Sequence, residues 1–103
     1  MPTVDELFGY KIWIFTKEGF PLKPIHLHIG KNVSYTEAKV WIHKSGKTKL
    51  DDITGTIPKK DLERIQKTIE LWSEKYMELW KEIHGEISYK KEFNREKNKG
   101  LER

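Results

Sequence analysis

The hydrophobic period of this sequence changes once along the chain, and that change constrains the fold more than any other feature. Residues 10–16 are rich in aromatic and β-branched side chains, and residues 25–29 and 35–42 alternate as half-buried strands do. Apolar side chains then recur at intervals of three and four residues, at Leu62, Ile65, Ile69, Trp72, Tyr76, Leu79 and Ile83. This spacing is typical of one face of an amphipathic helix. We therefore expect an α+β protein, in which a small antiparallel sheet of three to four strands packs on one long C-terminal helix.

The ends of the expected helix are marked by residues that commonly bound helices. Pro58 suits a first turn, and Gly85 follows the last apolar position. A helix over residues 59–84 would be about 39 Å long, which is more than a sheet of this size requires. We therefore expect its end to project or to pack on a partner, as in a homodimer. Residues 1–85 are predicted to form a single domain, and residues 86–103 a charged C-terminal tail.

The charge of the chain is unevenly distributed. The formal net charge is +4, but residues 10–50 alone hold eight lysines and two glutamates, for a net charge of +6. Such a concentration of lysine is common on a solvated surface, and it also favours an anionic partner such as a nucleic acid or an acidic protein. The chain has no cysteine, which excludes disulfides, zinc–thiolate sites and cysteine nucleophiles. With no long apolar run and no signal-like start, we expect a cytoplasmic protein that does not associate with membranes.

Two histidines, His26 and His28, share one face of a predicted strand. Apolar residues alternate with them over residues 25–29, so the two imidazoles should lie about 6.5–7 Å apart on the face opposite the core. The next strand follows after a short turn, which predicts a hairpin. The simplest register sets His28 opposite Glu37. It sets His26 opposite Lys39, and a register two residues away also keeps both histidines out of the core.

These side chains fit several kinds of chemistry. A carboxylate beside an imidazole orients the ring and raises its pKa, which suits acid–base catalysis. In a small ribonuclease, His26 and His28 would act as base and acid. Glu37 would orient one imidazole, and Lys39 would stabilise the phosphate. The two histidines are also candidate ligands for a divalent metal ion in a metal-dependent hydrolase. The alternative is that both histidines are structural, in a subunit without chemistry at these positions.

A binding surface is a further hypothesis for the first half of the chain. Single-stranded nucleic-acid binders combine basic side chains with aromatic rings on which bases stack. The candidate contact residues for a nucleic acid or an acidic partner are Lys11, Lys23, Lys31, Lys39, Trp41, Lys44 and Lys47. Trp41 would supply a stacking surface. The sequence holds no phosphate-binding glycine loop and no recognisable Ser/His/Asp arrangement.

Several short segments carry a family resemblance in their order along the chain. They are Met1-Pro-Thr3, Gly9-Tyr10 with Ile12-Trp-Ile-Phe15, Pro24-Ile-His26-Leu-His28, Glu37-Ala-Lys39-Val-Trp41, and Asp61-Leu62 with Trp80 and Gly85. In these segments the sequence resembles a small prokaryotic family, the domain-of-unknown-function family 4160. Members often carry a further histidine upstream of the proline, and residues 18–24 lack it here.

The resemblance implies that the protein works in a two-component module, but it implies no reaction mechanism. Members resemble one half of a toxin–antitoxin-like pair, whose protein partner is encoded nearby. A basic sheet face would then contact RNA or DNA, or an acidic partner, and the helix would contact the cognate protein.

Overall fold

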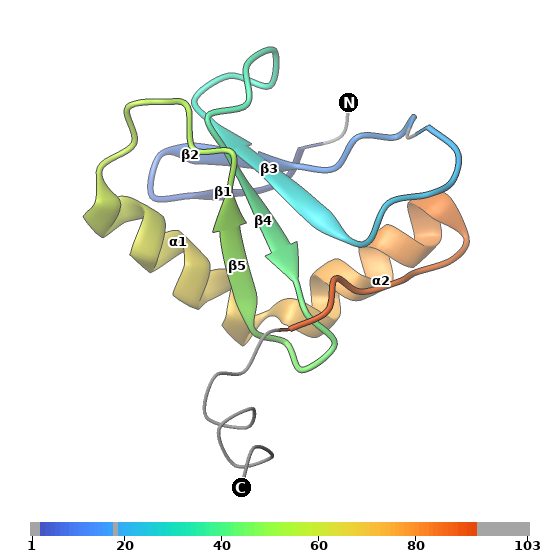
Figure 1. Cartoon of the computed structure of the whole chain (residues 1–103). Coiled ribbons are helices and arrows are strands. Elements are labelled where there is room, and N and C mark those ends of the chain that lie inside the picture. The colour runs from blue at the N-terminus through green and yellow to red at the C-terminus, as the bar shows by residue number, and fades with distance from the viewer. Residues whose placement is uncertain (1–2, 18, 93–103) are drawn as a thin grey trace, which may run out of the picture.

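The computed structural model describes residues 3–17 and 19–92 of the 103-residue chain, and in this part it is an α+β fold. Its strands are β1 (Thr3–Leu7), β2 (Tyr10–Trp13), β3 (His26–Gly30), β4 (Ala38–Ile42) and β5 (Thr48–Asp51). Its helices are α1 (Lys59–Leu71) and α2 (Ser73–His84). The strands form one antiparallel sheet in the order β1-β2-β3-β4-β5, so each strand lies beside its neighbour in the sequence (Figure 1).

The α+β class is confirmed, but the sheet has five strands in the described residues rather than three to four. The strand without a clear sequence signal is β1, whose sequence TVDEL contains two acidic residues. A two-residue connection joins β1 to β2, and both Phe8 (φ 53°) and Gly9 (φ 85°) have the positive φ that type I′ hairpin turns require. The turn geometry therefore creates this edge strand, although its side chains do not alternate.

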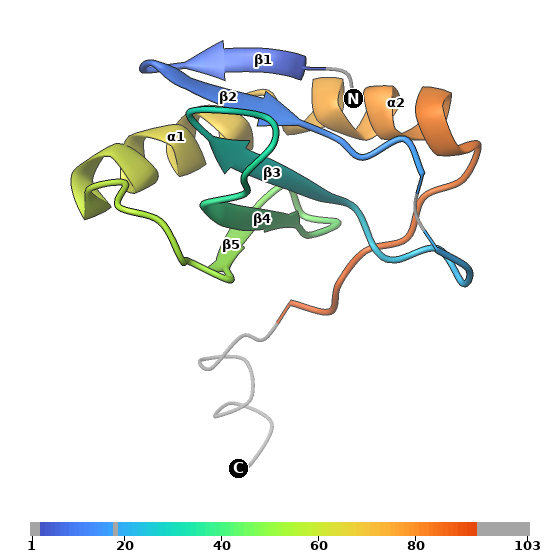
Figure 2. The same ribbon diagram turned by 90° about the horizontal axis from the view of Figure 1, so that it is seen from above.

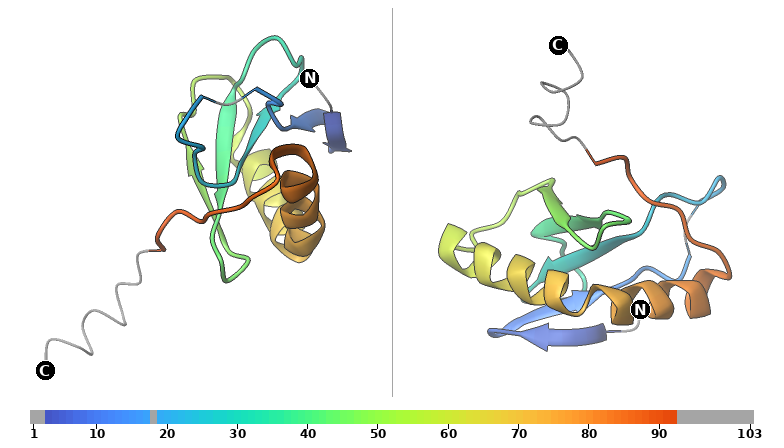
Figure 3. Two further views of the ribbon diagram at one scale, coloured as in Figure 1. Left: turned by 90° about the vertical axis from the view of Figure 1, so that its right-hand side faces the viewer. Right: turned by 90° about the horizontal axis from the view of Figure 1, so that it is seen from below.

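The two helices run end to end across one face of the sheet (Figures 2 and 3). They bury Leu62, Ile65, Ile69, Tyr76 and Trp80 against a sheet face that carries Ile12, Leu27, Ile29, Ala38, Val40 and Ile42. These side chains form one continuous apolar core. No helix among the described residues is both long enough and apolar enough to cross a membrane.

The prediction of one helix over residues 59–84 is wrong, because the helix breaks at Trp72. The backbone there (φ −109°, ψ 26°) is not helical. After Ile69 the buried row continues through Ser73 rather than Trp72. The turn between β4 and β5 approaches the helix at this point, and a Cβ built on Gly46 would lie 2.9 Å from Ser73 Oγ. A small residue therefore faces the sheet, and Trp72 remains 55% exposed.

The segment after α2 returns along the sheet (Figure 1). The backbone N–H of Ile25 donates to Ser88 O at 2.9 Å, and Ile87 and Tyr89 pack on the edge of the core. Of the predicted tail over residues 86–103, residues 86–92 thus lie against the domain. Residues 93–103 are outside the described part of the chain.

Candidate functional site

The register of β3 and β4 differs by two residues from the simplest one. His28 lies opposite Lys39, and His26 lies opposite Trp41. Between the strands, Asn32 and Tyr35 form an isolated bridge, and Asn32 Oδ1 accepts hydrogen bonds from the N–H and hydroxyl of Ser34. This local turn occupies residues that the simplest register would have paired with β3. Both histidines remain on the face opposite the core, but Glu37 is opposite neither of them.

The Glu37 carboxylate holds two loops together. Its Oε2 accepts from the backbone N–H of Lys31 at 3.0 Å, and its Oε1 accepts from that of Thr56 at 3.3 Å. Its backbone oxygen accepts from Thr54 and Gly55. Glu37 is buried, and a Cβ at Gly55 would collide with its side chain. The carboxylate thus ties the loop before α1 to the turn after β3, which is a structural task.

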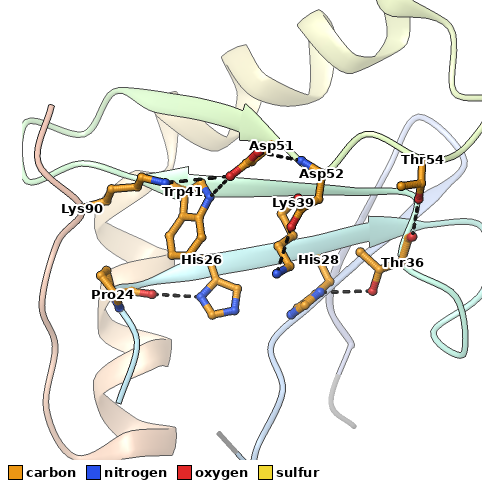
Figure 4. Close-up of polar contacts among 10 residues, drawn as sticks. All are labelled: Pro24, His26, His28, Thr36, Lys39, Trp41, Asp51, Asp52, Thr54 and Lys90. Carbon is orange, nitrogen blue, oxygen red and sulfur yellow. Dashed lines mark hydrogen bonds and ion pairs between the residues drawn. The ribbon is translucent and has the colours of Figure 1, made fainter. Parts of the chain in front are cut away.

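The two imidazoles are buried, each about 2% exposed. His26 Nδ1 donates to Pro24 O at 2.9 Å, and His28 Nδ1 hydrogen-bonds with Thr36 Oγ1 at 3.1 Å (Figure 4). Burial lowers the pKa of His28 to about 3, with smaller contributions from the nearby positive groups His26, Lys39 and Lys23. His28 is therefore neutral near pH 7. A group so difficult to protonate is a weak general acid or base at that pH.

Both histidines belong to a cluster of rings that extends from β2, β3 and β4 to α2, which we call the ring cluster. Its members are Trp13, Phe15, His26, His28, Trp41, Trp80 and His84, linked by ring-centroid distances of 3.9–5.7 Å. Within residues 3–17 and 19–92, no group of three or more histidine, cysteine or acidic side chains is placed to hold a metal ion. That part of the chain therefore supplies no third ligand for a metal ion that His26 and His28 were predicted to bind.

Trp41, predicted to stack on bases, is only 9% exposed. Its Nε1 donates to Asp51 Oδ2 at 3.1 Å, and Lys90 Nζ lies 4.4 Å from the ring centroid (Figure 4). Lys90 also forms an ion pair with Asp51 at 3.8 Å. The C-terminal segment therefore covers the indole, and the ring offers no free face for a base.

The predicted binding lysines are divided between the two ends of the sheet. Lys11 and Lys31 lie where β3 ends, whereas Lys44 and Lys47 lie where β4 ends. Lys23 precedes β3. The remaining candidate, Lys39, forms an ion pair with Asp52 at 3.1 Å (Figure 4). The predicted set is thus divided into separate groups, with Lys11 and Lys31 at one end of the sheet and Lys44 and Lys47 at the other.

Lys44 and Lys47 are joined by two lysines that sequence reasoning missed. Lys49 lies on β5, and Lys91 lies in the returning C-terminal segment. We call these four exposed lysines the basic hairpin surface. Among the described residues, none of the four forms an ion pair. No signal in the sequence places Lys91 here, because its position depends on the path of the chain after α2.

A pocket of about 360 Å³ lies within the basic hairpin surface, lined by His43, Lys47, Thr48, Lys49, Glu70, Lys91 and Glu92. Its walls are fixed by hydrogen bonds between distant segments. Glu70 Oε2 accepts from the N–H and hydroxyl of Thr48 at 2.9 and 2.8 Å, and His43 Nδ1 donates to Lys90 O at 2.9 Å. Ser45 Oγ donates to Glu92 Oε1 at 2.7 Å. These hydrogen bonds therefore fix the β4–β5 hairpin relative to α1 and to the segment that follows α2.

Comparison with known proteins gives one finding for this chain. The family model described as "Domain of unknown function (DUF4160)" matches residues 9–81. This range contains the sheet from β2 onward, α1 and most of α2. Neither the curated proteins nor the solved structures contain a significant match.

Proposed function

Because the chain belongs to the family of unknown function DUF4160, which assigns no activity, we propose its function from its charges: it binds nucleic acid through the basic hairpin surface. The observation that carries this proposal is the convergence of Lys47, Lys49 and Lys91 from two segments around one pocket, with Lys44 in the same hairpin turn. Lysines that neutralise backbone phosphates supply most of the affinity of sequence-independent nucleic-acid binding.

Lys39 on β4 and Lys90 in the returning segment are less suited to this role. Lys39 and Lys90 are paired with Asp52 and Asp51. An incoming phosphate would have to compete with these carboxylates. The four lysines of the basic hairpin surface form no ion pair within the described residues, and the nearest aspartate interaction is that of Lys49 with Asp51. Two glutamates line the same pocket, and each accepts hydrogen bonds from hydroxyl or backbone donors of the hairpin that fix its position.

The ribonuclease and hydrolase hypotheses receive less support than binding. Glu37 is engaged by backbone N–H groups, so it is not available to orient an imidazole. His28 is buried and has a pKa of about 3. These features favour a structural role for the histidines in the fold that supports the basic hairpin surface.

The setting of this binding activity is proposed from the family resemblance. The chain would act as one half of a toxin–antitoxin-like module with a protein encoded nearby. Expression with and without the adjacent gene tests the setting. Growth inhibition that the neighbour relieves, together with co-purification of the two proteins, would support it. Equal growth and no co-purification would contradict it.

The binding proposal is tested with short RNA and DNA oligonucleotides by fluorescence anisotropy. We expect binding at about 50 mM salt that weakens steeply toward 200 mM, because counterions are released from the phosphates. The double variant Lys44→Glu/Lys47→Glu should reduce affinity at least about tenfold and flatten the salt dependence.

The matched control is Lys60→Glu/Lys67→Glu, which changes the net charge equally but acts on exposed positions of α1. The control should retain most of the affinity. Equal losses in both double variants would show a general charge effect and contradict a defined surface. Absence of any binding at about 50 mM salt would contradict the proposal as a whole.

A further inference from the structure

Trp72 is the exposed member of the four tryptophans. Trp13 and Trp80 are 0% exposed and Trp41 is 9% exposed, whereas Trp72 is 55% exposed at the junction of α1 and α2. A single exposed apolar side chain is common on protein surfaces, but Trp72 lies at a helix junction that contacts the lysine-bearing β4–β5 hairpin. Its position in the apolar helical row predicts a core residue, so the exposure of Trp72 could not be predicted from the sequence.

The junction between α1 and α2, where Trp72 lies, packs directly against the β4–β5 hairpin. Ser73, the next residue, meets the hairpin turn at Gly46. Two residues before Trp72, Glu70 accepts two hydrogen bonds from Thr48 on β5. Hairpin and helix junction are also side by side when the molecule is seen from below (Figure 3, right). The exposed Trp72 therefore belongs to a helix junction that is held against the β4–β5 hairpin, which carries Lys44, Lys47 and Lys49.

We propose that Trp72 is a stacking platform for an unpaired base, and that the nucleic acid bound by this protein is single-stranded. The inference rests on the proposed function and specifies its partner. Within a duplex, both faces of a base are covered by its neighbours and exposing one costs unstacking energy, whereas the bases of a single strand are free to stack on Trp72. Basic side chains that follow the backbone, next to an aromatic ring that receives a base, are the recurring arrangement of single-strand binders.

The neighbouring residue, Leu71, makes it possible to distinguish base stacking from the docking of a protein. Leu71 is 77% exposed beside Trp72. An acidic protein docking on this apolar pair would use the area of both side chains, whereas base stacking requires the flat ring of Trp72 alone. Leu71→Ala is thus the matched control for Trp72→Ala. Trp72→Leu keeps an apolar side chain but removes the ring, and Trp72→Phe keeps a ring.

The test measures the affinity of the full chain for a short oligouridylate and for an RNA duplex at about 50 mM salt, where electrostatic binding is strong. Trp72→Ala and Trp72→Leu should weaken oligouridylate binding about 5- to 150-fold, the range expected for one stacked base. Trp72→Phe should retain most of the affinity, and Leu71→Ala should change it less than about threefold. Duplex binding should be the same in all four variants.

Intrinsic fluorescence provides a second measurement. Because the other three indoles are buried, oligouridylate should quench the emission of Trp72 selectively. The quenching should disappear in Trp72→Phe even though binding remains. Urea unfolding of each variant confirms that the fold is retained.

The outcomes separate this inference from the proposed function. If Trp72→Ala binds oligouridylate normally while Lys44→Glu/Lys47→Glu does not, the stacking inference is overturned and nucleic-acid binding stands. If neither RNA form binds but polyglutamate does, both proposals are overturned in favour of an acidic protein partner. If Leu71→Ala weakens binding as much as Trp72→Ala, stacking is overturned as well.

Discussion

At the residue scale, His28 couples the stability of the fold to pH. Its folded-state pKa is about 3, lowered by burial and then by the neighbouring positive groups, whereas a histidine in an unfolded chain titrates near 6.5. Between these values the unfolded chain binds a proton that the folded protein excludes. The contribution of His28 is therefore complete above about pH 6.5. It is lost progressively as the pH falls toward 3.

This coupling predicts how the free energy of unfolding changes with pH. From pH 7 to pH 5, the wild-type protein should lose about 2 kcal/mol more than the variant His28→Asn, which has no titrating group at this position. Urea unfolding of both proteins at the two pH values measures the difference. Parallel losses in the two proteins would show that His28 titrates normally in the folded state.

At this scale the sequence could predict which face of a strand a side chain occupies, but not which side chain lies opposite it on the next strand. The alternation around His26 correctly placed both histidines on the strand face opposite Leu27 and Ile29, but that face is buried as well and the strand is not half-buried. It could not place Glu37, because a strand register that slips by two residues leaves the pattern of faces unchanged. The turn around Asn32 decided that register through hydrogen bonds of its own. A side chain such as Glu37 can therefore share a strand face with an imidazole in one register and hold loops together in another.

At the scale of elements, helical spacing predicted the extent of the helical region but not its break. The interval from Ile69 to the next buried position can be three or four residues in an amphipathic helix. Trp72 and Ser73 occupy these two alternatives, and hydrophobicity favours Trp72. The structure buries Ser73 because the hairpin turn at Gly46 leaves no room for a large side chain. This contact joins residues far apart in the sequence, so local periodicity does not contain it.

The contact between Gly46 and Ser73 gives a prediction about the hairpin. Gly46→Ala should destabilise the protein for two reasons, since Gly46 has a φ of +94° and a Cβ there would lie 2.9 Å from Ser73 Oγ. Gly85 has a similar φ of +80° with open space around it, so Gly85→Ala measures the backbone cost alone, about 1–2 kcal/mol. We expect Gly46→Ala to cost about 1 kcal/mol more than this control.

A double-mutant cycle checks the origin of that difference by urea unfolding. Ser73→Ala removes the hydroxyl that the new methyl group would meet. In the Ser73→Ala background, Gly46→Ala should cost about as much as Gly85→Ala. Strict additivity of the two substitutions would contradict a contact between them.

At the scale of the whole molecule, the path of the chain after α2 determines which surfaces are available. The returning segment supplies Lys91 to the basic hairpin surface, and its Lys90 covers Trp41. Composition correctly indicated an excess of lysine in residues 10–50. It could not indicate which lysines would be neutralised by aspartates and which would remain unpaired. That distribution depends on how β5 and the C-terminal segment lie beside β4, and so it required the folded structure.

The returning segment also predicts that residues 86–92 stabilise the domain. Ser88 O and Lys90 O accept hydrogen bonds from Ile25 and His43, and Ile87 packs on the core. A chain ending at Gly85 should therefore be less stable than one ending at Glu92 by about 2–4 kcal/mol. Because both chains lack residues 93–103, their difference in urea unfolding reports on this segment alone. The shorter chain should also expose Trp41 to quenching by acrylamide, since it lacks the lysine that covers the ring. Equal unfolding midpoints and equal quenching would mean that the sheet closes without this segment.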